Sequence, residues 1–219
     1  VDQVTLTAKR MDGYSISSNE LIQDADPGAI VGMLLSQFVE AIGQKVDSAV
    51  FKGTGDPVSG VFVSAGYSQV FSTGSAHFSM LLEADLRSII SKIPASRLGN
   101  AKWYVNRSPA WTYLYGLKDS QNRLLFIPSM NQANPHMLYG YPVRMPEEAP
   151  SASAVSTGFI VFGDLKKGML IGDRLTNISL FVDPYTLSRS YQTLFLMFTR
   201  WAFAQALPNS FGRIATPGS

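Results

Sequence analysis

Two glycine-spaced runs beside lysines are the first candidates for chemistry, because such runs can cradle a phosphate group. Residues 50–62 read VFKGTGDPVSGVF, and residues 163–168 read GDLKKG. A phosphate loop follows a strand and leads into a helix whose first N–H groups bind the anion. In the first run a helical pattern comes before the glycines and an extended apolar segment comes after. In the second, Met-Leu follows where a Walker loop requires Lys and Ser or Thr. We therefore interpret Gly53 as a left-handed helix cap and residues 163–168 as a turn between strands.

The other reactive residue types form no catalytic or metal-binding pattern. The two histidines, His77 and His136, lie in loop contexts without a second ligand at a metal-binding offset. The pair Glu147-Glu148 lies between prolines in a polar loop, which is typical of a solvated turn rather than of acid/base chemistry. The absence of cysteine excludes thiolate sites and disulfides. A Ser-His-Asp triad that forms only in space stays open, although no G-x-S-x-G elbow marks one. We predict no catalytic residue, no cofactor and no metal.

The composition favours a structural protein. The chain has 219 residues, is 46% hydrophobic and only 16% charged, against about 25% charged residues in ordinary soluble domains. An uncharged surface suits burial against copies of the same chain or against a partner. The net charge of +2 is too small to argue for nucleic-acid binding. No apolar run reaches the roughly 18 residues of a membrane helix, so we expect no membrane association.

A long helix is the most strongly specified element. Asp26 can accept hydrogen bonds from the first free N–H groups, and Pro27 suits the first helical position. Apolar residues then recur at helical spacing until Gly53. We predict one continuous helix over residues 27–51, roughly 38 Å long at 1.5 Å per residue. Asp26, Pro27 and Gly53 are its expected structural caps.

The rest of the chain alternates between short helices and strands, which gives an α+β fold. We expect helices over 80–93, capped by Ser79, and over 108–117. Residues 129–137 are rich in Asn and Pro and form an expected exposed loop. Near the end, two long strands over 177–182 and 191–206 are joined by the turn 183–189. Shorter strands are expected over residues 4–10, 103–105, 139–143, 159–162 and 169–171.

The order of these elements and their motifs resembles the major capsid proteins of tailed bacteriophages with the Hong Kong 97 fold. In that family a strand leads through S-x-E-L-L-x-D into a long spine helix, which ends in G-x-G and then P-x-G. Later motifs resemble L-K-D at 117–119, L-x-G-x-P-V at 138–143, and the pair f-G-D and i-x-D-R between 162 and 174. The resemblance covers essentially the whole chain. The residues at the first set of motif positions are Ser18, Glu20, Leu21, Asp24, Gly53, Gly55, Pro57 and Gly60.

The resemblance implies a peripheral (P) domain, an axial (A) domain and a structural role without enzymatic activity. The P domain would comprise residues 1–57, with the spine helix, and 177–205, with the long strands. The A domain would comprise residues 58–176, and the tail 206–219 would return to it. Identical copies would assemble into pentamers and hexamers of an icosahedral phage or prophage shell around double-stranded DNA.

The resemblance also implies contact residues between copies. The turn Asp183, Pro184, Tyr185 and Arg189 would meet its symmetry mates where three capsomers join, with Asp183 and Arg189 pairing between copies. The loop 129–137 would contact neighbours around the capsomer centre. Its expected contact residues are Asn131, Gln132, Asn134 and His136.

Partners and location follow from the same resemblance. The expected partners are other copies of the chain, scaffolding protein, portal protein, maturation protease and packaged DNA, the last without sequence-specific contact. The expected location is the virion capsid, after assembly in the host bacterial cytoplasm. The family's N-terminal arm and long E-loop hairpin have no counterpart in these residues. The family's lysine–asparagine cross-link is not expected either, because Tyr191 and Phe198 stand at the asparagine and glutamate positions.

Two alternatives stay open at this point. The nearer one is an encapsulin-type nanocompartment shell, which shares the fold but packages a cargo enzyme. The more distant one is a hydrolase or binding protein whose site lies in the mixed middle segment.

Overall fold

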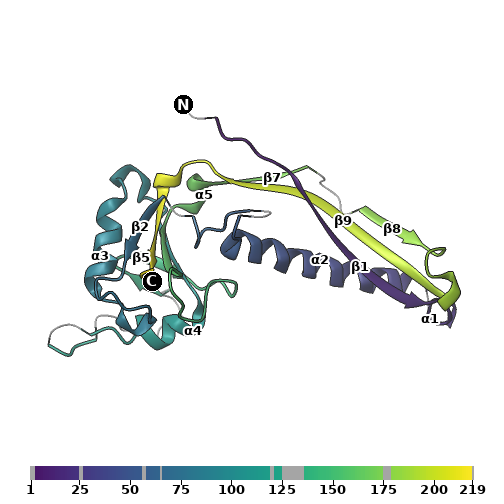
Figure 1. Ribbon diagram of the computed structural model, residues 1–219, viewed down its shortest axis with the longest axis horizontal. Coiled ribbons are helices and arrows are strands. Elements are labelled where there is room, and N and C mark those ends of the chain that lie inside the picture. The colour runs from purple at the N-terminus through teal and green to yellow at the C-terminus, as the bar shows by residue number, and fades with distance from the viewer. Residues whose placement is uncertain are drawn as a thin grey trace. The chain divides into compact units, whose positions relative to one another are not determined.

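A computed structural model describes residues 3–24, 27–55, 58–64, 66–118, 121–124, 136–174 and 179–218 (Figure 1). The chain divides into two compact units. Unit 1 comprises Val1–Asp47 and Ile171–Phe203, and unit 2 comprises Ser48–Leu170 and Ala204–Ser219. Among the described residues, no helix is long and apolar enough to cross a membrane.

Unit 1 contains the long helix predicted from the sequence. Helix α2 runs without interruption over Pro27–Lys52, so the predicted helix over 27–51 is confirmed. Pro27 is its first residue, as expected, whereas Asp26 lies outside the described residues. Gly32 and Gly43 do not break it, because the backbone hydrogen bonds of a helix do not depend on a side chain. A shorter helix, α1, precedes it over Asn19–Asp24.

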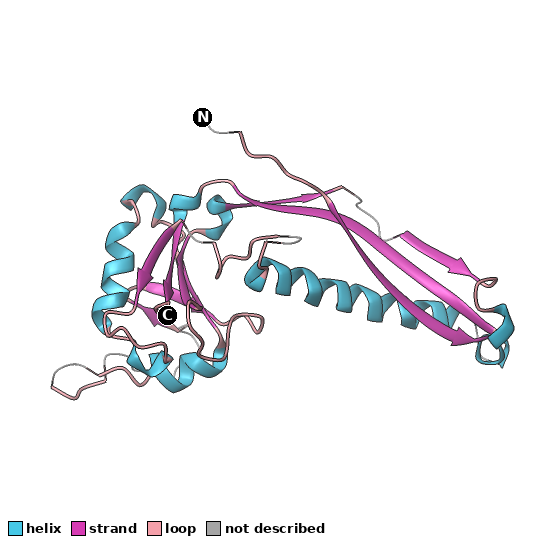
Figure 2. Ribbon diagram, viewed as in Figure 1, coloured by secondary structure: helices cyan, strands magenta, loops and turns pink. Residues whose placement is uncertain are grey.

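A sheet built around one long strand accompanies α2 in unit 1. Strand β9 (Gln192–Gln205) pairs antiparallel with β1 (Lys9–Ser18) on one side and with β8 (Ser179–Asp183) on the other. Strand β7 (Met169–Asp173) also pairs with β9. One face of this sheet is buried: Phe195, Met197 and Trp201 of β9 are almost inaccessible. Gly13, directly opposite Met197, lies so close to Phe38 of α2 that an added Cβ would be 3.0 Å from the ring. The helix therefore covers this face (Figure 2).

Unit 2 contains a six-stranded mixed sheet in the order β2-β10-β6-β3-β5-β4. Strands β2 and β10 are parallel, as are β3 and β5, and the other described pairs are antiparallel. Helix α3 (Glu83–Lys92) packs against the sheet. The strands are β2 (Tyr67–Val70), β3 (Lys102–Val105), β4 (Met137–Leu138), β5 (Tyr141–Arg144), β6 (Gly158–Gly163) and β10 (Phe211–Ala215).

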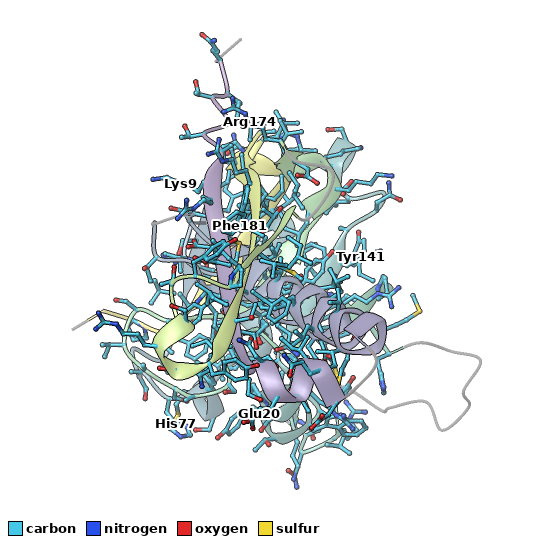
Figure 3. The ribbon with its side chains drawn as sticks, turned by 90° about the vertical axis from the view of Figure 1, so that its right-hand side faces the viewer. Lys9, Glu20, His77, Tyr141, Arg174 and Phe181 are labelled. Atoms are coloured by element: carbon cyan, nitrogen blue, oxygen red, sulfur yellow. The ribbon has the colours of Figure 1, made fainter. Side chains whose placement is uncertain are left out.

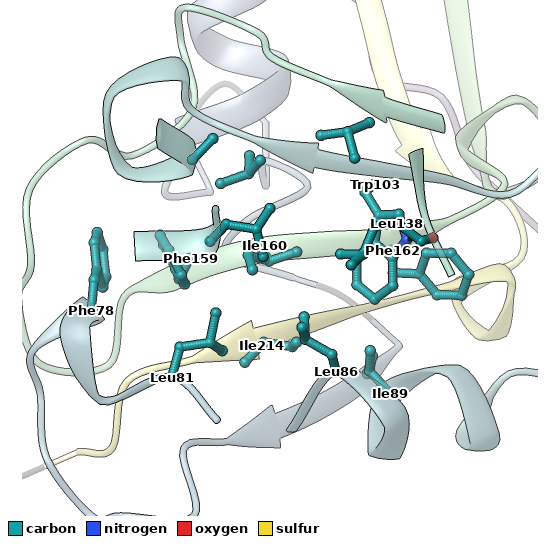
Figure 4. Close-up of a cluster of buried hydrophobic side chains, with 14 of the residues drawn as sticks. Phe78, Leu81, Leu86, Ile89, Trp103, Leu138, Phe159, Ile160, Phe162 and Ile214 are labelled. Atoms are coloured by element: carbon teal, nitrogen blue, oxygen red, sulfur yellow. Dashed lines mark hydrogen bonds between the residues drawn. The ribbon is translucent and has the colours of Figure 1, made fainter. Parts of the chain in front are cut away.

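The core of unit 2 is closed and aromatic (Figure 4). Trp103 and Phe162 are fully buried, with ring centroids 4.2 Å apart. The indole N–H of Trp103 donates to the carbonyl of Leu138 at 3.0 Å, so the one polar atom of this side chain is satisfied. Phe78 stacks on Phe159 at 4.2 Å. The predicted strand over 103–105 is present as β3, and Trp103 lies in the core.

Two predicted helices differ from the structure. The helix expected over 80–93 is a 3-10 turn at Phe78–Met80 followed by α3, which begins only at Glu83. Ser79 is therefore not its cap. The buried carboxylate of Asp85 accepts from the N–H groups of Leu82 and Ser72, and this long-range contact fixes the start of α3.

The helix expected over 108–117 is also irregular. It begins with a helical turn at Arg107–Pro109, labelled α4, and continues as a π-helical turn over Ala110–Leu114. The N–H of Tyr115 accordingly donates to the carbonyl of Ala110, five residues earlier.

The end of α2 corrects the interpretation of Gly53. Its backbone is not left-handed; Gly55, with φ of 121°, is the residue in that region. A Cβ at Gly53 would lie 2.3 Å from the carbonyl oxygen of Val58, so glycine is required by close backbone approach. The chain folds back after the helix, and the N–H groups of Gly60, Val61 and Phe62 donate to the carbonyls of Gly53, Val50 and Phe51, respectively. These bonds satisfy carbonyls that a helix end otherwise leaves free.

The second glycine run forms one helical turn, α5 (Leu165–Gly168), between β6 and β7. One carboxylate oxygen of Asp164, Oδ1, accepts from the N–H groups of Lys166 and Lys167 at 3.1 and 3.3 Å. The N–H groups that a phosphate loop would offer to an anion are therefore used by a side chain of the same run.

Candidate functional site

The predicted turn between β8 and β9 is present and is built around Asp183. The Asp183 carboxylate accepts from the N–H of Tyr185 at 2.8 Å, from the N–H of Thr186 at 3.2 Å and from the Thr186 hydroxyl. The Thr186 hydroxyl, followed by the two N–H groups, lowers the pKa of Asp183 below its ordinary value. The Asp183 carboxylate therefore stabilises the turn in which it lies.

The tip of this hairpin is also fastened to α1. The carbonyl of Tyr191, a non-glycine residue with φ of 53°, accepts from the N–H of Asn19 at 3.0 Å. The Tyr191 hydroxyl accepts from the side-chain amide of Gln23 at 3.0 Å. The Thr193 hydroxyl donates to Oδ1 of Asn19 at 2.6 Å. These three hydrogen bonds, made by Tyr191 and Thr193, therefore fasten the base of the turn to α1.

The outward groups of the turn are aromatic and cationic. Tyr185 is 83% exposed, and Pro184 and Arg189 are exposed as well. The structure brings together all four residues predicted for this contact. It gives Asp183 an internal role, so Tyr185 and Arg189 are the side chains that the turn offers to a neighbour.

The outer face of the unit 1 sheet carries an exposed apolar row that the sequence did not reveal. Tyr14, Leu196 and Phe181 lie directly opposite one another across β1, β9 and β8. Tyr14 is 70% exposed and Phe181 is 56% exposed. Phe181 is labelled in Figure 3. Ile16 continues the row opposite Leu194. Contiguous exposed apolar side chains of this kind mark interaction surfaces.

The predicted axial loop is only partly described. Asn131, Gln132 and Asn134 lie outside the described residues, and His136 is described. Its ring lies 5.7 Å from that of Trp111 and 5.6 Å from that of Tyr115, between ring centroids. Trp111 is 49% exposed, and burial raises the pKa of Tyr115 to about 12. His136 is therefore part of an aromatic cluster on the π-helical turn.

The hairpin next to this cluster is strained. Tyr139 and Gly140 join β4 and β5, with φ of 50° and 79°. The Tyr139 hydroxyl donates to Glu83 of α3 at 2.8 Å. This hydrogen bond anchors Tyr139 in a backbone conformation with positive φ, which residues other than glycine rarely adopt. Burial, followed by the bond to Glu83, raises the pKa of Tyr139 to about 12.

A cavity of about 220 Å³ in unit 2 contains two cations that are already engaged. Lys52 forms an ion pair with Glu148 at 3.4 Å. Nη1 of Arg213 donates to the carbonyls of Phe62, at 3.0 Å, and Val63. These contacts hold the chain that folds back from α2, so the cavity has a structural explanation. In the described part of the chain, no group of three or more His, Cys, Asp or Glu could hold a metal.

Comparison with known proteins places these features in a family context. A model described as the Phage capsid family matches residues 1–215. Comparison with curated protein sequences finds no match.

Solved structures share the fold at low sequence identity. The capsid of an empty GTA particle matches with a TM-score of 0.80 and 20% identity, over 99% of this chain and 74% of that chain. A structure from Mycobacterium phage Cain matches with a TM-score of 0.62 and 16% identity, over 98% and 74%. The holo-SrpI encapsulin complex from Synechococcus elongatus PCC 7942 matches with a TM-score of 0.66 and 11% identity, over 96% and 73%.

Proposed function

The chain belongs to the Phage capsid family, and we propose that its copies form pentamers and hexamers that close an icosahedral shell around double-stranded DNA. The chain has the Hong Kong 97-type fold and is a structural protein, a major capsid protein that forms a shell. The match of the family model over residues 1–215 is the observation that carries the proposal. The outer row of Tyr14, Leu196 and Phe181 supports it, since a shell subunit must bury surface against several neighbours.

We assign unit 1 to the peripheral domain and unit 2 to the axial domain. The expected P domain, residues 1–57 and 177–205, overlaps most of unit 1, which contains most of α2 and the long strands. The expected A domain and tail, residues 58–176 and 206–219, overlap most of unit 2.

The turn 183–189 is the proposed contact between capsomers. Tyr185 has the features of a contact anchor, because a large ring on a fastened turn loses little conformational freedom on binding. Arg189 supplies a cation that can pair with an acid or with the ring of Tyr185 in a neighbouring copy. Each such rim contact contributes roughly 0–1 kcal/mol, but it is repeated at every junction and fixes register.

The axial contact is proposed for His136 and the neighbouring Trp111, together with Asn131, Gln132 and Asn134. Packaged DNA, scaffolding protein, portal protein and maturation protease are the proposed further partners, and assembly would take place in the host bacterial cytoplasm.

A nanocompartment shell of the encapsulin type is the second candidate, because the encapsulin match has a TM-score of 0.66. Purified particles distinguish the two. Nuclease-protected double-stranded DNA supports the phage-type shell, and an enclosed protein cargo without DNA supports the encapsulin type.

Charge reversal at the turn tests the contact proposal. In the full-length gene product, Arg189→Glu should leave folded capsomers but reduce closed shells to a small fraction of the wild-type yield. Lys45→Glu, an exposed site on α2, is the matched control and should assemble normally. Light scattering and electron microscopy measure the yield. Normal shells from Arg189→Glu would show that the turn does not join capsomers.

A further inference from the structure

Three arginines lie together at one end of the unit 1 sheet. Arg10 of β1 lies directly opposite Arg200 of β9. Arg174, which directly follows β7, donates its backbone N–H to the carbonyl of Arg200 at 3.0 Å, so it lies next to Arg200. Arg10 and Tyr14 are an even number of residues apart on β1, so both project from the outer face. All three arginines are exposed, and we call them the arginine row.

The arginine row has too little negative charge around it. Asp12 pairs with Arg10 at 3.2 Å. The guanidinium groups of Arg174 and Arg200 have no hydrogen-bond or ion-pair partner within the described part of the chain. Like charges directly opposite each other destabilise a sheet, so this surface gains from an anion outside the unit. The charged residues at this end sum to +2, four positive against two negative: Lys9, Arg10, Arg174 and Arg200 against Asp12 and Asp173.

The other end of unit 1 is acidic. Strand β1 leads directly into α1, whose Glu20 and Asp24 are exposed. Neither carboxylate has a side-chain partner among the residues that the structure describes. With the adjoining turn included, the described charged residues at this end sum to −2, three negative against one positive: Glu20, Asp24 and Asp183 against Arg189.

The two ends are too far apart to neutralise each other within one copy. Arg10 and Ser18 stand near the two ends of β1, and a strand rises about 3.4 Å per residue, which gives a separation of roughly 27 Å. The Debye length at physiological ionic strength is only about 8 Å. Each end therefore needs its counter-charge from solvent ions or from another molecule.

We propose that the arginine row binds the α1 end of a second copy of the chain, with its guanidinium groups on the carboxylates of Glu20 and Asp24. This contact rests on the proposed assembly of copies into a shell. Guanidinium and carboxylate groups match as planar, bidentate pairs. The two ends carry equal and opposite net charge, and such complementarity orients association and fixes its register. Since every copy has both ends, the contact continues from copy to copy, as a closed assembly requires.

A second copy fits this surface better than a nucleic acid does. Between the two ends the outer face is apolar, with Tyr14, Leu196 and Phe181 directly opposite one another. A phosphate backbone would pair with the arginines but leave this apolar surface in water, whereas a protein partner can cover both. The turn at the α1 end offers Tyr185 and Arg189 rather than carboxylates. Its proposed contact between capsomers therefore uses other side chains than this one.

Charge reversal at the two ends, separately and together, tests the proposal in the full-length protein expressed alone. Arg174→Glu with Arg200→Glu reverses the row, and Glu20→Arg with Asp24→Arg reverses the α1 end. Each double variant should raise the protein concentration needed for shell assembly roughly 10-fold, because attractive exposed pairs become repulsive. The quadruple variant restores opposite charges across the contact, so it should assemble within about 3-fold of the wild-type concentration. Light scattering and electron microscopy measure assembly.

The matched control reverses two exposed lysines away from both ends. Lys45→Glu with Lys167→Glu makes the same change in charge and should assemble like the wild type. Circular dichroism checks that each variant is folded. If a reversed variant is not folded, the neutral pair Arg174→Gln with Arg200→Gln decides, and it should weaken assembly and make it less sensitive to NaCl.

The outcomes separate this contact from the proposed function. Wild-type shells together with normal assembly of either reversed pair, or no recovery in the quadruple variant, would overturn the contact alone. Binding of a short DNA duplex that is lost in Arg174→Glu with Arg200→Glu, while shells still form, would assign the row to DNA and overturn the contact as well. A wild-type protein that forms no shell would overturn the proposed function, and this contact with it.

Discussion

The sheets of the two units differ in how completely their apolar faces are buried. In unit 2, Trp103 and Phe162 are enclosed between the sheet and α3, and the one polar atom of Trp103 has its partner. In unit 1, α2 covers one face of the sheet, while the other leaves Tyr14 and Phe181 more than half exposed. Unit 2 is therefore complete as a folded body. The sheet of unit 1 presents the kind of surface that a neighbouring copy can cover.

We expect the largest loss of stability from a substitution at Trp103, and a much smaller loss at Trp111 of the same unit. Trp103→Ala should lower the free energy of unfolding by about 3–5 kcal/mol, because it empties a fully buried site and leaves the Leu138 carbonyl without its donor. Trp111→Ala, at a half-exposed site, is the comparison and should cost far less. Urea denaturation followed by circular dichroism measures both. Equal losses would mean that the core of unit 2 does not centre on Trp103.

The two faces of the unit 1 sheet should respond in opposite ways. Met197→Ala, on the face covered by α2, should cost about 2–5 kcal/mol of stability. Phe181→Ala, on the outer face, should leave stability within about 1 kcal/mol of wild type and reduce shell yield instead. Denaturation and electron microscopy of the same preparations give both numbers. Full shell yield from Phe181→Ala would show that the outer face makes no contact between copies.

Gly53, at the end of α2, and Gly32, within it, differ in the space around the backbone. Gly53→Ala places a Cβ 2.3 Å from the Val58 carbonyl oxygen and should cost about 1–3 kcal/mol. Gly32→Ala meets no atom within 4 Å and should stabilise the helix by up to about 1 kcal/mol. Thermal melts compare the two. A stabilised Gly53→Ala would show that close backbone approach does not require glycine at this position.

The smallest expected effect concerns the turn. A lowered pKa means that the ionised Asp183 favours the folded turn above the ordinary value of 3.8, and that this contribution is lost as the pH falls through the lower folded pKa. The turn should therefore be unaffected between pH 5 and pH 8. Thr186→Val removes the largest cause of the shift and should move the Asp183 pKa back towards 3.8. A carbon-detected NMR titration of the carboxylate measures this pKa. An unchanged pKa in Thr186→Val would show that the Thr186 hydroxyl does not cause the shift.

Local patterns predicted the elements whose signals are local. Proline at the start and apolar residues at helical spacing specify α2, and the Asp-Pro-Tyr-Thr sequence lies at the turn between β8 and β9. Asp183 could have been recognised as an internal acceptor, because Asp commonly bonds N–H groups two and three residues ahead.

Features that depend on distant parts of the chain could not be predicted in this way. The start of α3 depends on Asp85 meeting Ser72, and the need for glycine at position 53 depends on Val58 returning to the helix end. The outer apolar row depends on the register of three strands. The family motifs, in contrast, were readable because their order extends over the whole chain.

A high-resolution cryo-EM reconstruction of particles formed by the full-length gene product would show which side chains the neighbouring copies cover. We expect a closed shell in which neighbouring copies cover Tyr14 and Phe181, and in which Tyr185 and Arg189 lie at the junction of capsomers. Particles in which these four side chains face solvent, with the contacts made elsewhere, would contradict it.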